Sequence, residues 1–229
     1  MVPIDYFDIA AERAASQVAI IDGDRQVTYE ELTRISHHIG GLVSSLATGG
    51  EAVPAVLFSP NDWRVIAAMV GIMRAGGAIV PLHAESNIET AVDFLNQVGA
   101  RCVFYHSSLS PQVRQLRDAV PTLRTCVRLD DRVDQELSLE TLLAEPPTPI
   151  ADWIEPSGNR SRPLFYWSTS GSTGRPKVVV EDCGCFDAVL KVTRGIDYSA
   201  SHHVSLSWDT ASEQYGRVLL GLEPTNRRF

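Results

Sequence analysis

The residues best suited to chemistry lie together in one stretch, Ser168-Thr-Ser-Gly-Ser-Thr-Gly-Arg-Pro-Lys177. Its hydroxyls are hydrogen-bond donors, and its glycines allow a positive φ and a close approach of the backbone. Successive N–H groups in such a loop can form an anion-binding nest, and Lys177 adds a point charge suited to phosphate. Apolar runs at 164–167 and 178–180 flank the stretch, which predicts a strand, a loop and a second strand. We interpret the loop as a holder of polyphosphate; the alternative is a flexible, hydroxyl-rich surface loop.

This stretch differs from the phosphate loop of P-loop NTPases. That signature places Gly-Lys-Ser/Thr at the start of a helix. Here Arg175 and Pro176 separate Gly174 from Lys177, and Val178 follows the lysine where a magnesium-binding hydroxyl would stand. The sequence therefore indicates a different class of phosphate-binding loop.

Residues 169–177 resemble the phosphate-loop signature of the adenylate-forming (AMP-binding) enzymes. These include acyl-CoA synthetases, luciferase and the adenylation domains of nonribosomal peptide synthetases. Val178 departs from the signature, which usually has glycine there. The resemblance continues upstream in Ala19–Gly23, Val27–Leu32 and Met73–Leu82, where His83-Ala84 replaces the family's usual Asp-Pro. It covers nearly the whole chain in order, as an amino-terminal portion of the family's sequence.

The resemblance implies ATP and Mg²⁺ as cofactors and a carboxylic or amino acid as substrate. In the family, the carboxylate attacks the α-phosphate of ATP, and an acceptor then takes the acyl group. The residues that match the phosphate-binding loop are Thr169, Ser170, Gly171, Ser172, Thr173, Gly174 and Lys177. Asp209, in Trp208-Asp-Thr-Ala211, matches the aspartate that holds the substrate's α-ammonium in the amino-acid-activating branch. A helix cap is the alternative role for Asp209.

Several parts of the family pattern do not match this chain, including the segments for adenine and ribose and the small carboxyl-terminal domain with the catalytic lysine. No catalytic residue is therefore assigned, and we expect this chain alone to be inactive. The leading hypothesis is the amino-terminal part of an ATP-dependent acid–AMP ligase. The alternatives are a non-catalytic remnant that acts as a binding or scaffold domain, and an unrelated α/β phosphate-binding protein.

The elements that must position the loop follow from periodicity. Capped helical patterns alternate with short apolar runs, which predicts an α/β fold with a largely parallel sheet and helices on both faces. The expected strands are 54–58, 78–82, 102–105 and 125–129, and the expected helices include 29–46, 88–98 and 111–120. Ligands of such sheets lie beyond the carboxyl ends of strands. That rule selects Ser59–Asn61 and His83–Glu85, although ordinary loops with helix caps are the alternative there.

We divide the chain into a first α/β subdomain at 1–143, a turn-rich connector at 144–162, and the phosphate-loop strands with the start of a second sheet subdomain at 163–229. We expect the family's carboxyl-terminal domain to be absent from this chain. His37 and His38 are expected on the solvated side of the helix that contains them. The four cysteines are expected to be buried or partly buried free thiols, with no metal site.

Composition limits the partners. The net charge of −8 and the lack of a basic patch argue against nucleic acid. The apolar run at 65–80 is interrupted by Arg74 and two glycines, so we expect no membrane span. No secretory signal is recognised and free thiols suit a reducing compartment, which predicts a cytoplasmic protein. A homo-oligomer or a carrier protein is left open as partner.

Overall fold

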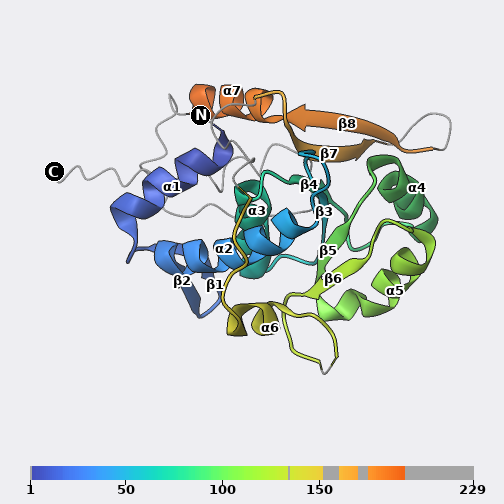
Figure 1. Cartoon of the computed structure of the whole chain (residues 1–229), viewed down its shortest axis with the longest axis horizontal. Coiled ribbons are helices and arrows are strands. Elements are labelled where there is room, and N and C mark those ends of the chain that lie inside the picture. Colours follow the sequence, from blue (N-terminus) through green and yellow to red (C-terminus); the bar gives the residue numbers. More distant parts are fainter. Residues whose placement is uncertain (1, 134, 152–159, 170–174, 194–229) are drawn as a thin grey trace.

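The computed structural model describes residues 2–133, 135–151, 160–169 and 175–193. Strands and helices alternate along most of this length (Figure 1). The strands are β1 Val18–Asp22, β2 Arg25–Thr28, β3 Pro54–Phe58, β4 Ala78–Pro81, β5 Cys102–Tyr105, β6 Thr125–Arg128, β7 Pro163–Thr169 and β8 Lys177–Asp182. The helices are α1 Pro3–Ala14, α2 Tyr29–Ser45, α3 Trp63–Arg74, α4 Ile88–Val98, α5 Ser110–Ala119, α6 Leu139–Ala144 and α7 Cys183–Thr193, with a 3₁₀ turn at Ser107–Leu109.

The main sheet has six strands in the order β6-β5-β3-β4-β7-β8, and β1 and β2 form a separate antiparallel pair. Strands β3 to β7 run parallel, and β8 turns back antiparallel to β7. The central strand β3 is buried along its whole length, as expected for a parallel strand covered on both faces. The predicted α/β fold with a largely parallel sheet is confirmed.

Side-chain alternation divides the core between the two faces of this sheet. Ala55 and Leu57 of β3 pack on the face that carries α1, α2 and α3, whereas Val56 and Phe58 pack against α4 and α5 on the other face. Figure 1 shows these two groups of helices on either side of the strands. Neighbouring parallel strands repeat this alternation, so burial on both faces fixes their register.

Local sequence signals account for the helix starts. The Thr28 side chain accepts a hydrogen bond from the N–H of Glu31, the Asp62 side chain from Arg64, and the Asn87 side chain from Thr90. Each of these bonds satisfies a backbone donor that has no partner within its helix. At the other end of α4, Gly99 adopts a left-handed conformation with φ of 67°.

Two glycines in α2 let the connector cross closely. A Cβ atom on Gly41 would lie 2.1 Å from the carbonyl oxygen of Thr148, and one on Gly40 would lie 3.0 Å from the Ile150 side chain. The backbone N–H of Ala151 donates to Ser44 Oγ at 3.0 Å. The described part of the connector at 144–151 is therefore fixed along α2.

Two expectations about individual side chains need correction. His37 is exposed as expected, but His38 is only 7% exposed, and its Nδ1 lies 3.0 Å from the carbonyl oxygen of Leu142. The six-residue helix α6 packs on α2 there. Contact with this helix, which is distant in sequence, buries His38 at a position that the sequence pattern places on the surface. The second correction concerns Cys185, which is exposed near the start of α7. The other three cysteines agree with the expectation, because Cys102 and Cys183 are buried and Cys126 is half-buried.

Three elements were not expected, namely α1, the β1–β2 hairpin and α6. The rest of the expected second sheet subdomain falls on residues 194–229, outside the described residues. The strands β7 and β8 themselves extend the first sheet. Within the described residues, no helix combines the length and apolar character needed to cross a membrane.

Candidate functional site

The carboxyl ends of β3 and β4 are the candidate ligand-binding edge of this fold. After β3 the chain enters α3 on one face of the sheet, and after β4 it enters α4 on the opposite face. Connections that leave neighbouring parallel strands toward opposite faces create a switch point, where ligands of open α/β sheets bind. The segments that follow these strands contain Ser59–Asn61 and His83–Glu85, which the sequence also selected.

The β7–β8 hairpin lies directly beside this switch point. Phe165 of β7 is paired in parallel with Ile79 of β4, so the carboxyl end of β7 lies at the same edge of the sheet as the carboxyl end of β4. Two more observations fix the hairpin. Trp167 Nε1 donates to Glu181 Oε2 at 2.9 Å across the strand pair, and the Gln97 side chain of α4 donates to the carbonyl oxygen of Pro176 at 3.3 Å.

The ends of the predicted phosphate loop face each other in this hairpin. Thr169 and Lys177 are paired across the two strands, and the Thr169 hydroxyl lies 3.5 Å from the carbonyl oxygen of Lys177. Both residues are exposed. Ser170, Gly171, Ser172, Thr173 and Gly174 lie outside the described residues, as does Asp209. The two ends of the loop thus lie at the same edge of the sheet as the carboxyl end of β4.

Val178, the departure from the family signature, continues β8 without disturbing it. It pairs with Ser168 in the regular antiparallel register, and its side chain is half-buried against the core on the α4 and α5 face. A branched apolar residue fits this half-buried strand position.

The segments after β3 and β4 are organised by local hydrogen bonds. Ser59 is buried, and its hydroxyl donates to the carbonyl oxygen of Pro60 at 2.9 Å. His83 is exposed, and its Nδ1 accepts the N–H of Glu85 at 3.2 Å. Asp62 caps α3. These contacts describe well-formed turns, and ligand contact at either segment remains a prediction.

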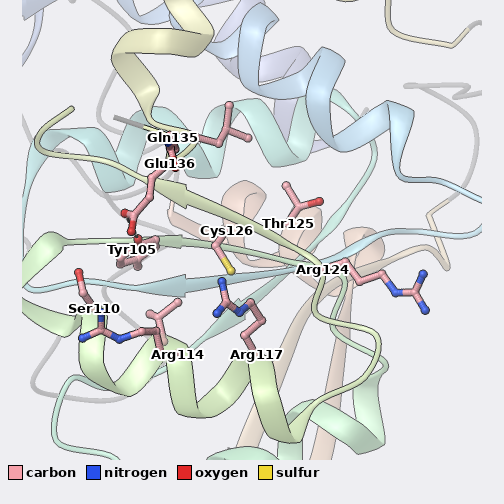
Figure 2. A pocket seen from close by; sticks show the side chains of 11 residues that line it. Tyr105, Ser110, Arg114, Arg117, Arg124, Thr125, Cys126, Gln135 and Glu136 are labelled. Atoms are coloured by element: carbon pink, nitrogen blue, oxygen red, sulfur yellow. Dashed lines mark hydrogen bonds between the residues drawn. The ribbon is translucent and has the colours of Figure 1, made fainter. Parts of the chain in front are cut away.

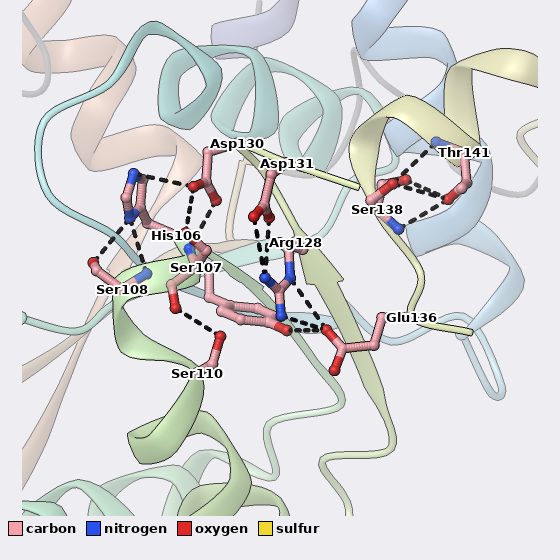
Figure 3. Close-up of polar contacts among 11 residues, drawn as sticks. His106, Ser107, Ser108, Ser110, Arg128, Asp130, Asp131, Glu136, Ser138 and Thr141 are labelled. Carbon is pink, nitrogen blue, oxygen red and sulfur yellow. Dashed lines mark hydrogen bonds and ion pairs between the residues drawn. The ribbon is translucent and has the colours of Figure 1, made fainter. Parts of the chain in front are cut away.

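A polar cluster that the sequence analysis missed follows β5 and β6 at this same edge of the sheet (Figure 3). Asp130 accepts hydrogen bonds from the backbone N–H of Ser107 at 2.7 Å and from the Ser107 hydroxyl at 2.6 Å, and His106 Nε2 lies 3.3 Å from its carboxylate. Burial acts to raise the pKa of Asp130, but the hydrogen bonds and the nearby His106 outweigh it, so the pKa lies below its ordinary value.

Arg128 forms the second half of this cluster. Its guanidinium contacts Glu136 at 2.6 Å and Asp131 at 3.0 Å, and the Tyr105 hydroxyl donates to Glu136 at 3.3 Å. These contacts hold Asp131 and Glu136 against the end of the sheet. A signal was available in the sequence, because Asp130-Asp131 directly follows one predicted strand and His106-Ser107 another.

Helix α7, which follows the hairpin, is attached through a buried carboxylate. Asp187 is fully buried, accepts the Tyr6 hydroxyl of α1 at 2.5 Å, and lies 2.9 Å from the Arg160 guanidinium. Burial of a carboxylate is costly unless it is paired and hydrogen-bonded. Asp187 therefore links three segments that are distant in sequence.

Comparison with known proteins identifies the family of this chain. The sequence model of the AMP-binding enzyme family matches residues 7–199. The nonribosomal peptide synthase roqA of Penicillium rubens is 30% identical over 170 residues, which is 74% of this chain and 6% of that protein. The nonribosomal peptide synthetase atnA of Emericella nidulans is 31% identical over 168 residues, which is 73% of this chain and 2% of that protein.

Solved structures share the fold. The anthranilate CoA ligase AuaEII in complex with anthranoyl-AMP superposes with a TM-score of 0.72 at 18% identity, covering 83% of this chain and 36% of that one. The N-terminal domain of FACL13 from Mycobacterium tuberculosis gives 0.71 at 19% identity, covering 86% of this chain and 48% of that one. This chain thus spans less than half of each of these proteins. With a family match over most of its length, the chain belongs to the AMP-binding enzymes.

Proposed function

We propose that this chain is the amino-terminal part of an ATP-dependent ligase that activates a carboxylic or amino acid as its adenylate. The observation that carries the proposal is the position of the β7–β8 hairpin. Its two ends, Thr169 and Lys177, lie at the carboxyl edge of a parallel sheet, beside the switch point between β3 and β4. Because the chain belongs to the AMP-binding enzymes, we expect a nucleotide to bind at this position.

In this proposal the hairpin holds the phosphates of ATP. Lys177 supplies a positive charge, and Thr169 with Ser170, Ser172 and Thr173 supplies hydroxyl donors. Gly171 and Gly174 let backbone N–H groups approach the phosphate oxygens. Such donors stabilise negative charge that develops at the phosphates and orient the α-phosphate for attack. Asp209 would accept the ammonium of an amino acid substrate, for which an acceptor-only carboxylate is suited.

Mg²⁺ accompanies ATP in this proposal and would neutralise phosphate charge when bound. Ser170, Ser172 and Thr173 carry hydroxyl oxygens, the ligand type that a hard cation prefers. The residues of this chain then bind and orient the nucleotide. Resemblance to nonribosomal peptide synthetases favours an amino acid substrate and a carrier protein as the acceptor partner. Four free cysteines support a reducing, cytoplasmic location.

Titration calorimetry with ATP–Mg²⁺ tests the role of the hairpin. We expect weak binding by the whole chain, reduced at least tenfold by Lys177→Ala, because a charge-assisted contact to phosphate is lost. Lys177→Arg keeps the charge and should retain most of the affinity. Arg132→Ala removes an exposed cation elsewhere, paired with Glu140 at 3.9 Å, and serves as the matched control. Equal affinity in Lys177→Ala and the control would reject the role of the lysine.

A second measurement separates a partial ligase from a complete one. Since the chain spans a small share of its relatives, we expect no carboxylate-dependent pyrophosphate exchange from the chain alone. ATP binding without exchange is also what the alternative, a non-catalytic binding or scaffold domain, predicts. Exchange above background with an amino acid or fatty acid would contradict the expected inactivity and exclude that alternative.

A further inference from the structure

A hollow with a marked excess of positive charge lies at the outer edge of the sheet, apart from the hairpin. It encloses about 360 Å³ between α5, β6 and residues 135–137 (Figure 2). Its charged lining residues are Arg114, Arg117, Arg124 and Glu136. The Glu136 carboxylate already contacts Arg128, so the three arginines are not balanced by it. In a chain with a net charge of −8, this concentration of positive charge is unusual.

Helix α5 presents two of these arginines along one stripe. Val113 and Arg114 each lie about one turn before Arg117, and all three line the hollow. The Arg114 guanidinium makes no hydrogen bond or ion pair with any residue in the described part of the chain. The charge partner of Arg117 is its neighbour Asp118, at 3.8 Å and largely exposed. Both guanidinium groups therefore retain donors for a ligand.

The opposite wall is the outer edge of β6. The Leu129 N–H donates inward to the carbonyl oxygen of Tyr105, whereas the Arg128 N–H donates outward to the carbonyl oxygen of Leu137. Backbone groups alternate in direction along a strand, so the N–H of Cys126 points outward as well, toward the hollow. Figure 2 shows the Arg117 guanidinium directed toward the Cys126 side chain, whereas Arg124 extends away from it at the rim.

We propose that this hollow binds a small phosphate-bearing molecule. Guanidinium donors from α5 and a backbone donor from β6 approach from two sides, which suits the tetrahedral oxygens of phosphate better than a planar carboxylate. The volume leaves room for a group attached to the phosphate. This inference is independent of the proposed function, since it uses neither the hairpin nor ATP.

Cys126 provides a local test, because its half-buried thiol lines the hollow. Burial raises the pKa of the Cys126 thiol, so alkylation by iodoacetamide is carried out above about pH 8.5, the usual thiol pKa, and followed by peptide mass spectrometry with pyrophosphate as the probe. We expect pyrophosphate to slow labelling of Cys126 at least threefold in a saturable manner, and citrate at equal ionic strength to have little effect. Fully buried Cys102 must stay unlabelled, which verifies folding in every sample.

Substitutions test whether the protection of Cys126 arises from binding in this hollow. Arg114→Ala and Arg117→Ala should each remove most of the protection, whereas Lys177→Ala in the hairpin and Arg132→Ala outside both sites should preserve it. Arg114 is exposed, so its replacement tests the site without disturbing the core. The proposal is overturned if protection is not saturable, if citrate protects equally, or if the protection survives both arginine substitutions or is lost in Lys177→Ala.

Discussion

The parallel strands at the centre of the sheet and the β7–β8 hairpin at its side are built in opposite ways. Every residue of β3 and β5 is buried, and Phe104 is completely inaccessible. In the hairpin, Val179 and Val180 are 47% and 52% exposed, and Thr169 and Lys177 face solvent. Burial of apolar surface stabilises the central strands, whereas exposure leaves polar groups of the hairpin available to a ligand.

The hairpin is held to the rest of the molecule at its base, where Leu164 and Phe165 of β7 are buried, and its outer part is exposed. One parallel pairing joins β7 to β4, the Gln97 side chain contacts Pro176, and Asp187 links the following helix to α1. Elements held this way open at lower free energy than core strands do. The comparison implies that substitutions in the centre change stability, and substitutions in the hairpin change binding.

The largest expected loss of stability follows from a substitution in the central strands. Phe104→Ala should lower the free energy of unfolding by about 3–5 kcal/mol, because it removes a fully buried ring and leaves a cavity. Val180→Ala in the exposed part of β8 should change it by less than about 0.5 kcal/mol. Urea denaturation monitored by circular dichroism measures both. Similar losses in the two variants would remove the distinction between the regions.

A smaller effect is expected where the hairpin side is attached to the rest of the molecule. Asp187→Ala should cost about 2 kcal/mol, since the Tyr6 hydroxyl loses its buried acceptor, while Arg160, 53% exposed, can turn to water. Hydrogen exchange should show the loss in α7 and β8 before it appears in β3. Asp118→Ala, a largely exposed carboxylate, is the control. Uniform loss of protection across the sheet would contradict a local role.

The smallest effect concerns Asp130 and depends on pH. Its folded-state pKa lies below the unfolded value, so its stabilisation is present above about pH 4 and is lost as the pH falls through the folded-state pKa. Asp130→Asn should therefore destabilise by about 1 kcal/mol at pH 7. Once the pH has fallen below the folded-state pKa of Asp130, the variant should match the unsubstituted chain. Denaturation at a series of pH values measures this, with Asp93→Asn on α4 as control; a pH-independent difference would refute it.

Much of the central sheet could be predicted because its signals are local. The strands 54–58 and 102–105 occur at the predicted residues because each is a short apolar run. The helix 88–98 does so because its apolar period lies between the Asn87 cap and Gly99. The start of α1 has no side-chain acceptor at its N-cap, because Val2 occupies that position, and its start signals are Pro3 and Asp5 in the first turn. Ser138 and Thr141 do cap α6 reciprocally, but threonine replaces the Glu or Gln of the usual motif.

Contacts between residues that lie far apart in the sequence were harder to predict. The sequence predicted a polyphosphate loop between two strands, and its two ends, Thr169 and Lys177, occur opposite each other in β7 and β8. The pairing of β7 with β4, the burial of His38 beneath α6, and the contacts of Asp187 with Tyr6 and Arg160 join residues that lie far apart in the sequence. No local pattern encodes such contacts, because they depend on the order of strands in the sheet.

Hydrogen exchange with and without ATP–Mg²⁺ tests most directly whether the hairpin binds the phosphates of ATP. We expect peptides covering residues 163–182 to gain protection on addition of nucleotide, while β3, already protected by burial, stays unchanged. Lys177→Ala should abolish the gain, and Arg132→Ala should keep it. Nucleotide binding with no change in the hairpin, or with an equal change in Lys177→Ala, would contradict the proposed role of the hairpin.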